Sequence, residues 1–162
     1  MGGTHPTSMS KRAAHHLYLI MGGTHPTSMS EKHAQHSHMS MGGPACHHVR
    51  KAQHSHLTMG GRAFHHVINA QHLHSTMGGP ACHHVRKDQH LHLTMGGTHP
   101  ASMLERHTQH SHMTMGGPAC HHVRKAQHSH LSMGGPACHH VRKARCLHLT
   151  MGGPACHHVR NA

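Results

Sequence analysis

The apolar positions of the chain form a weak helical pattern that repeats. In the segment PACHHVRKAQHSH, which begins at Pro44, the residues Ala45, Val49 and Ala52 follow the i, i+4, i+7 spacing of one helix face. Pro44 suits the first turn of such a helix, and the Gly-Gly pair of the next unit suits its end. Because helices of about 12–14 residues without a packing partner are marginal in water, the pattern predicts transient short helices joined by Gly-Gly hinges.

Met-Gly-Gly opens every unit of a tandem repeat that runs through the sequence. Units one, two and six hold 20 residues, the other complete units hold 18, and the ninth holds 12. No composition shift and no linker divides the repeat, so we expect residues 1–162 to form a single His-rich tandem-repeat array. The units begin at Met1, Met21, Met41, Met59, Met77, Met95, Met115, Met133 and Met151.

Neither of two solenoid folds fits the apolar pattern. A stacked helical solenoid requires every unit to bury a face, and Ala45, Ala52 and one valine per unit supply too little apolar surface. A triangular β-solenoid requires apolar residues six apart, whereas Met41, Val49 and Leu57 are eight apart. The pattern therefore argues against a stacked repeat of either kind.

Composition favours disorder over a packed core. The chain is 34% hydrophobic, but it contains one Phe, one Tyr and no Trp. Burial of a large apolar side chain stabilises a fold by about 1.5–3 kcal/mol, while ordering the backbone of one residue costs about 1–2 kcal/mol. Two or three large aliphatic side chains in an 18-residue unit cannot offset that cost. We therefore predict a mostly disordered, low-complexity tandem-repeat chain with no globular core.

The charge balance predicts a pH-dependent polycation. Fifteen Lys and Arg residues face three acids, which gives a formal charge of +12, and 32 His residues add positive charge as the pH falls. Such a chain would bind nucleic acid or other polyanions through counterion release, most strongly at low salt or low pH. The aromatic residues that stack on bases are missing. The dipeptide Arg-Lys recurs after Val49, Val85, Val123 and Val141.

The density of metal ligands is the strongest chemical signal in the sequence. Residues two apart in an extended chain share a face, so Cys46 pairs with His48 and His54 pairs with His56. A turn over residues 49–53 would join these pairs into one thiolate and three imidazoles, a set acceptable to zinc, copper or nickel. The candidate ligands are Cys46, His48, His54, His56, Cys82, His84, His90, His92, Cys120, His122, His128, His130, Cys138, His140, Cys146 and His148.

Other kinds of chemistry find little support in the sequence. Adjacent Cys and His residues seldom face each other productively, and the three acids lie in three different units, so we expect no enzyme activity and no required cofactor. No apolar run approaches the length of a transmembrane segment. The gaps between the six Cys residues follow the repeat rather than a disulfide framework, and no targeting signal assigns a compartment.

Variation between the units favours a rival hypothesis, in which function did not shape the composition. Phe64 stands where Cys46 and Cys82 carry a thiol. A nucleotide string that encodes residues 28–32 (SMSEK) would, read one base out of phase, encode the HHVRK of residues 47–51. The two kinds of unit would then be one DNA repeat read in two frames, as in a translated minisatellite or a dubious open reading frame with no selected function. The coding DNA tests this hypothesis, which requires the units to align with an offset.

Overall fold

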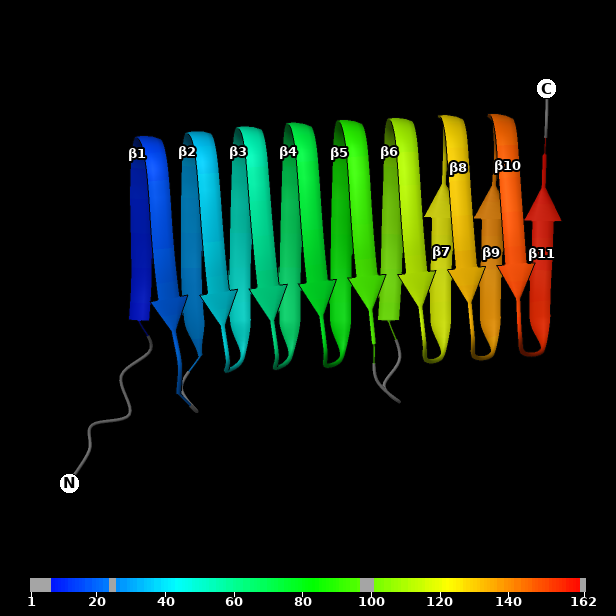
Figure 1. The fold of residues 1–162 in the computed structure, drawn as a ribbon, viewed down its shortest axis with the longest axis horizontal. Coiled ribbons are helices and arrows are strands. Elements are labelled where there is room, and N and C mark those ends of the chain that lie inside the picture. Colours follow the sequence, from blue (N-terminus) through cyan, green and yellow to red (C-terminus); the bar gives the residue numbers. More distant parts are fainter. Residues whose placement is uncertain (1–6, 24–25, 97–100, 161–162) are drawn as a thin grey trace.

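The computed structural model of this chain is a regular stack of β-strands (Figure 1). It describes residues 7–23, 26–96 and 101–160. Within those ranges the structure contains eleven strands and no helix, and every strand pair is parallel. The strands are β1 (Thr7–Met21), β2 (Thr27–Met41), β3 (Ala45–Met59), β4 (Ala63–Met77), β5 (Ala81–Met95), β6 (Ala101–Met115), β7 (Ala119–Val123), β8 (Ala126–Met133), β9 (Ala137–Val141), β10 (Ala144–Met151) and β11 (Ala155–Val159).

Each 15-residue strand turns back on itself half-way and forms one coil of a solenoid (Figure 1). In β3, buried side chains alternate along residues 45–49, the bend is filled by Ala52, and the alternation resumes along residues 55–59. In the seventh coil the same bend, at residues 124–125, divides the coil into β7 and β8. We call residues 45–50 and their counterparts the first arm, and residues 54–59 and their counterparts the second arm. The fold is therefore a two-sided parallel β-solenoid.

Neighbouring coils pair residue for residue. Val49 pairs with Val67 of the next unit, so equivalent residues of successive units stack in columns along the solenoid axis. Units two and six keep this register, because their two additional residues fall in the connections that precede Thr27 and Ala101. The tandem repeat predicted from Met-Gly-Gly is confirmed, since successive units supply successive coils.

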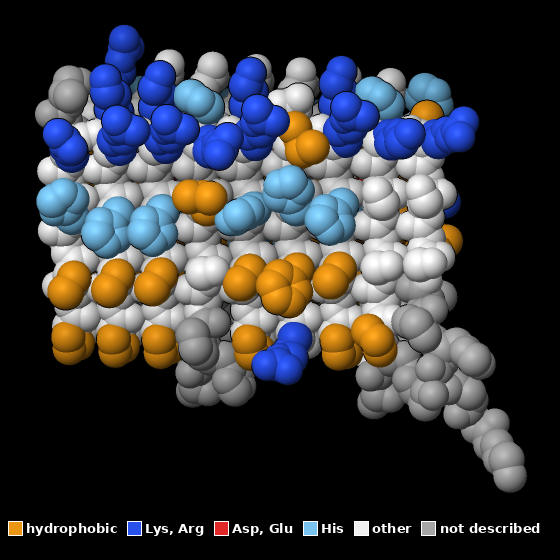
Figure 2. Space-filling model, turned by 180° about the vertical axis from the view of Figure 1, so that it is seen from behind, with side chains coloured by type: hydrophobic (Ala, Val, Ile, Leu, Met, Phe, Trp, Pro, Cys, Tyr) orange, Lys and Arg blue, Asp and Glu red, His pale blue; other side chains and the backbone are white. Residues whose placement is uncertain are grey.

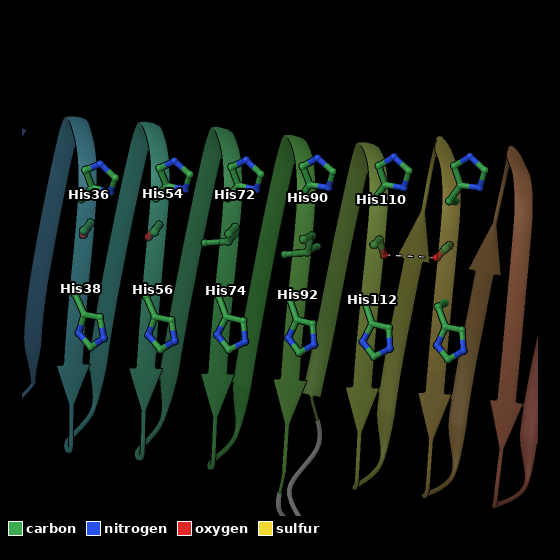
Figure 3. Close-up of a pocket in the computed structure, with 18 of the residues that line it drawn as sticks. His36, His38, His54, His56, His72, His74, His90, His92, His110 and His112 are labelled. Atoms are coloured by element: carbon green, nitrogen blue, oxygen red, sulfur yellow. Dashed lines mark hydrogen bonds between the residues drawn. The ribbon is translucent and has the colours of Figure 1, made fainter.

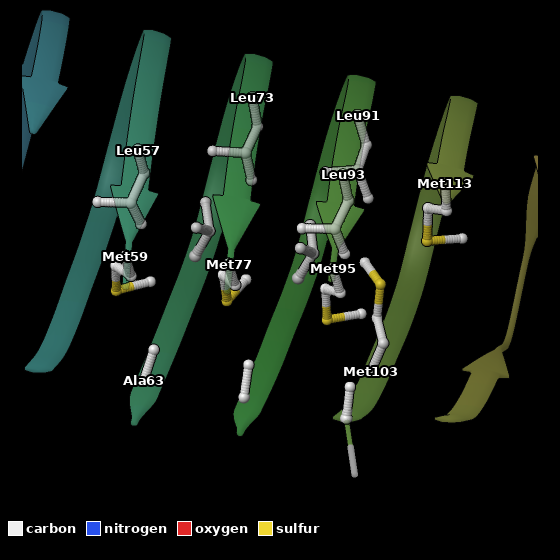
Figure 4. Packing of buried hydrophobic residues seen from close by; sticks show 14 of the residues in the cluster. Leu57, Met59, Ala63, Leu73, Met77, Leu91, Leu93, Met95, Met103 and Met113 are labelled. Atoms are coloured by element: carbon white, nitrogen blue, oxygen red, sulfur yellow. The ribbon is translucent and has the colours of Figure 1, made fainter. Parts of the chain in front are cut away.

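Methionine, leucine and alanine side chains fill the space between the two arms (Figure 4). Met59, Met77 and Met95 form one column and are only 0–3% exposed. The prediction of a mostly disordered, low-complexity chain without a core is therefore wrong. It counted the apolar surface of a single unit, whereas stacking covers each inward side chain with its copies in the neighbouring coils. Stacking also satisfies the backbone of each arm with ladder hydrogen bonds.

The prediction of transient helices is also wrong. Ala45, Val49 and Ala52, which form the apparent helix stripe, are all buried, but they lie on extended backbone. The rejection of a β-solenoid considered only a triangular coil. In a two-sided coil the inward positions alternate within each arm, so Met41, Val49 and Leu57 all point into the core despite their spacing of eight.

The Gly-Gly pairs at residues 60–61, 78–79 and 134–135 form tight corners rather than hinges. A Cβ atom on Gly61 would lie 2.6 Å from the carbonyl oxygen of Gly43 in the preceding coil. The corresponding closest approaches are 2.6 Å at Gly79 and 2.8 Å at Gly135. A Cβ atom on Gly60 would make only ordinary contacts, at 3.8 Å or more. The second glycine of these pairs therefore allows the corners of neighbouring coils to stack.

Candidate metal-binding faces

The two ligand pairs predicted within one unit lie on opposite faces of the solenoid. Cys46 and His48 point outward from the first arm, whereas His54 and His56 point outward from the second arm, and the core lies between the pairs. No group of three or more His, Cys, Asp or Glu side chains in the described ranges is already arranged to hold a metal ion. The same separation holds for Cys82 and His84 against His90 and His92, for Cys120 and His122 against His128 and His130, and for Cys138 and His140 against Cys146 and His148.

The second-arm face carries two parallel columns of stacked imidazoles, which we call the imidazole groove (Figure 3). Within each column, rings of neighbouring coils lie 4.6–5.0 Å apart and are parallel to within 9°. Ser55 and its counterparts lie between the columns, and the groove has a volume of about 1070 Å³. One column holds His16, His36, His54, His72, His90, His110 and His128, and the other holds His38, His56, His74, His92, His112, His130 and His148.

Several imidazoles of the groove are weakened as bases. Desolvation, followed by the positive charge of the neighbouring His38, lowers the pKa of His56. Desolvation, followed by the neighbouring His56 and His92, lowers the pKa of His74. The Nδ1 atoms of His56 and His74 are buried and have no hydrogen-bond partner, which leaves Nε2 at the groove. In the tautomer with its proton on Nδ1, each ring presents the lone pair of Nε2 to an incoming ion.

Four imidazoles from two neighbouring coils form the smallest repeating set in the groove. Along the columns, the rings of His54 and His72 lie 4.7 Å apart and those of His56 and His74 lie 4.6 Å apart. Across the groove, residues two apart on a strand are separated by about 6.6 Å. Rotation of the four rings out of their parallel stacks would aim their Nε2 atoms at one ion. We call these four imidazoles, two from each of two neighbouring coils, an imidazole square. An imidazole square can supply four nitrogen ligands to one ion without any ligand from another face.

The first-arm face carries a column of thiols beside a column of imidazoles. Cys120, Cys138 and Cys156 are register partners in three consecutive coils. The rings of His122 and His140 stack beside them, with centroids 4.9 Å apart. Sequence reasoning missed this grouping because it collected ligands within one unit. The signal was present in the 18-residue gaps between these cysteines, which equal the repeat period.

The remaining thiols of this column stand apart from one another. Phe64 lies between Cys46 and Cys82 and is 57% exposed. Ser28 pairs with Cys46 on its other side, and the hydroxyl of Ser102 donates a hydrogen bond to the Cys82 sulfur at 3.2 Å. Two thiols therefore adjoin only in the last three coils of the described chain.

Lysine and arginine side chains form exposed columns at the bend between the arms, visible as rows in Figure 2. We call these columns the cationic ridge. Where neighbouring coils both carry a cation, as at Lys125 and Lys143, parallel register sets the two at the strand spacing of about 4.8 Å. Ile68 and Asn69 interrupt the ridge in the fourth coil. The ridge includes Arg50, Lys51, Arg86, Lys87, Arg124, Lys125, Arg142 and Lys143.

A further column of imidazoles is buried in the core, which sequence reasoning did not foresee. His47, His65 and His83 are 0–1% exposed and stack with centroids 5.0 and 4.7 Å apart. Burial is the main cause that lowers the pKa of His65, and burial lowers the pKa of His83 to about 3. The alternation of residues along the first arm was the available signal, since His47 lies between the inward positions Ala45 and Val49. All three rings are core residues rather than ligands open to solvent.

Comparison with known proteins found no match to this chain. It matches no protein-family model, no curated protein and no solved structure. Among the described residues, no helix has the length and apolar character needed to span a membrane. The chemistry of the two faces is therefore the ground on which a function can be inferred.

Proposed function

We propose that this chain is a transition-metal-binding protein whose imidazole groove binds Cu²⁺, Ni²⁺ or Zn²⁺. The observation that carries the proposal is the parallel register, which sets His54 and His56 beside His72 and His74. Imidazole nitrogen is a good ligand for all three ions, and four nitrogens in a square suit the tetragonal geometry of Cu²⁺ and Ni²⁺. The groove thus replaces the one-unit ligand set with a set drawn from two coils.

The length of the groove sets the expected stoichiometry. Six consecutive coils carry both imidazoles, from His36 and His38 to His128 and His130. Ions in adjacent squares would share ligands and repel each other across about 4.8 Å. Ions in alternate squares avoid both problems. Six coils taken two at a time give about three ions per chain.

Metal binding of this kind also supports the fold. Each ion would tie two coils together through side chains that are positioned only when the register is correct. A ligand that binds the folded chain but not the unfolded chain raises the free energy of unfolding through mass action. The increase is about 2.7 kcal/mol when the free ligand concentration is one hundred times Kd. Metal should therefore raise the thermal midpoint of the solenoid.

The test is a calorimetric Zn²⁺ titration of the full chain with its six cysteines replaced by serine, which removes thiol ligands. Serine already occupies the thiol column at Ser28 and Ser102. This parent is compared with a groove variant and with a control that loses the same number of outward-facing imidazoles from the first-arm face. The groove variant carries His54→Gln, His72→Gln and His90→Gln, and the control carries His48→Gln, His66→Gln and His84→Gln.

We expect the parent and the control to bind about three Zn²⁺ ions per chain. The groove variant should bind about one, because only its sixth and seventh coils keep all four imidazoles of a square. Equal loss of ions from the groove variant and the control would contradict the proposal, as would a parent that binds no Zn²⁺.

The cationic ridge favours a second candidate function, the binding of a linear polyanion such as nucleic acid. Its side chains are exposed and lie in rows along the solenoid that Ile68 and Asn69 interrupt, and a flexible chain of phosphates could follow them while releasing counterions. Replacement of Arg124, Lys125, Arg142 and Lys143 by Gln should weaken binding of a single-stranded oligonucleotide and flatten its salt dependence. Replacement of the groove residues His54, His72 and His90 by Gln is the control. Binding that does not vary with salt would contradict this function.

A further inference from the structure

Two thiols and two imidazoles of neighbouring coils lie side by side on the face opposite the imidazole groove. Cys120 pairs with Cys138 in the register of β7 and β9, and His122 pairs with His140 two positions further along. The two rings are parallel to within 3°. All four side chains are exposed, so an ion can reach them without any opening of the fold. We propose that these four residues bind one Zn²⁺ ion in a tetrahedral site that bridges the two coils.

The spacings on this face fit tetrahedral zinc. Register partners on parallel strands lie about 4.8 Å apart. Two sulfurs that each lie about 2.3 Å from one tetrahedral zinc are about 3.8 Å apart, so the thiols of Cys120 and Cys138 need only lean toward each other. The imidazoles stand about 6.6 Å along the strand, and their longer side chains can reach back to the ion. Residues two apart on each strand thus supply one short and one long ligand.

The charge balance of the site also fits this face. The pocket that contains His122 and His140 is lined by Arg124 and Arg142 as well. Two thiolates neutralise Zn²⁺, so the loaded site adds no net charge beside these two cations. A site built only from imidazoles at the same place would add two positive charges. Thiolate ligands are therefore what makes the first-arm face suitable for a divalent cation.

The pair of strands β7 and β9 is a better place for the zinc site than the next pair along the axis, β9 and β11. Cys156 and His158 continue both columns in β11. However, the rings of His140 and His158 are 5.8 Å apart and tilted by 49°. Every side chain of β11 is exposed, whereas Ala119, His121 and Val123 anchor β7 in the core. The better-supported backbone lies at β7 and β9.

This site is separate from the imidazole groove in residues, in face and in ligand chemistry. It goes beyond the proposed function, because it does not require any ion in the groove. Zinc bound here would join β7 to β9 and so stabilise the coils near the end of the solenoid. Its test can use a signal that imidazole ligands alone do not give.

The experiment titrates the reduced full chain with Co²⁺ as a spectroscopic probe for Zn²⁺. Thiolate-bound tetrahedral Co²⁺ gives a sulfur-to-cobalt charge-transfer band as well as visible d–d bands. The site variant is Cys120→Ser with Cys138→Ser. The matched control is Cys46→Ser, Cys82→Ser and Cys146→Ser, which removes the thiols that the structure places elsewhere. Far-UV circular dichroism without metal checks that every variant keeps its β-structure.

We expect one Co²⁺ per chain with the charge-transfer band, displacement of Co²⁺ by Zn²⁺, loss of the band in the site variant, and an unchanged band in the control. His122→Gln with His140→Gln should shift the d–d bands while the charge-transfer band remains. The inference is overturned if the wild-type chain gives no band, if the site variant keeps it, if the control loses it, or if it appears only as dimers form. None of these results affects zinc binding by the cysteine-free chain, so the two proposals fail separately.

Discussion

Glu31 and His47 form a buried pair in the core of the solenoid. The Oε1 atom of Glu31 lies 3.7 Å from Nε2 of His47, and neither side chain is exposed. Ser37 donates a hydrogen bond to Glu31 at 3.4 Å, but the Oε2 atom of Glu31 has no partner. In the next coil, Val49 and Ser55 occupy the positions of Glu31 and Ser37. The acid is therefore a polar replacement at a position where the neighbouring coil holds valine.

Glu31→Val should stabilise the solenoid, because it makes the second coil resemble the third and removes a buried oxygen that has no partner. An unsatisfied buried polar group costs about 1–3 kcal/mol, and we expect a gain of about 1 kcal/mol or more in the free energy of unfolding. Urea unfolding followed by circular dichroism at pH 7.5 measures the change. Glu31→Gln, which keeps a polar side chain, should not show this gain. A clear loss of stability in Glu31→Val would contradict the view that Glu31 is a polar replacement at an apolar core position.

Acid should unfold the solenoid, because the core of the solenoid buries the imidazoles of His65 and His83 and so disfavours their protonated form. The pKa of His65 is lowered by burial and then by the neighbouring His83 and His47. Burial, followed by the neighbouring His84 and His66, lowers the pKa of His83 to about 3. Both values lie below the unfolded pKa of about 6.5, so the unfolded chain binds more protons in this range. The free energy of unfolding should fall as the pH drops below about 6.5, by about 1.4 kcal/mol per pH unit for each such imidazole.

The matched variant for this prediction is His65→Met with His83→Met, since the same column holds Met29 and Met103. Urea midpoints at pH 7.5, 6.0 and 4.5 should decrease steeply for the wild-type chain and less steeply for the variant. If stability is constant or rises on acidification, or if the variant follows the wild-type chain, the buried column does not control acid unfolding.

Gly61→Ala should destabilise the solenoid far more than Gly60→Ala. The new methyl group at position 61 would meet the Gly43 carbonyl oxygen at 2.6 Å, whereas that at position 60 would meet nothing closer than 3.8 Å. Overpacking of this kind costs about 1–3 kcal/mol. Thermal unfolding of the two variants side by side measures the difference. Equal effects at the two glycines would argue against the stacked corners.

Phe64→Cys should create a second thiol-imidazole site. Phe64 stands between Cys46 and Cys82, and His66 continues the imidazole column beside it. The substitution would place neighbouring thiols in the early coils, as Cys120 and Cys138 are placed in the later ones. Thiolate-bound Co²⁺ should rise from about one to about two ions per chain. Phe64→Ser is the control and should leave one ion, and an unchanged count in Phe64→Cys would count against cross-coil coordination.

The sequence revealed the repeat and its period but not the fold that the repeat builds. Ala45, Val49 and Ala52 were correctly singled out as one apolar set, and all three are buried. Their spacing fits one face of a helix equally well. In the two-sided coil the same spacing arises because Ala45 and Val49 lie on the alternating first arm and Ala52 fills the bend. What could not be seen from one unit is the stabilisation that arises between units, from ladder hydrogen bonds and from Met59 packing on Met77.

The ligands were identified as residue types, but their partners could not be read from local spacing. Cys120 was grouped with His128 and His130 because they are near in sequence, yet the structure places them on the other face. Its neighbour in space is Cys138, one full coil away. Only the coil geometry shows that a separation of one repeat brings residues together and that half a repeat separates them.

The most direct test of the account is the distance between Cu²⁺ ions bound to the cysteine-free chain, measured by pulsed electron paramagnetic resonance. Ions in alternate squares of the imidazole groove place the first and third ions four coils apart, which is about 19 Å at the parallel strand spacing. We predict a narrow distance distribution centred there, which His54→Gln, His72→Gln and His90→Gln abolish. A broad distribution, or a narrow one that survives these three substitutions, would contradict a solenoid that binds metal ions along its imidazole columns.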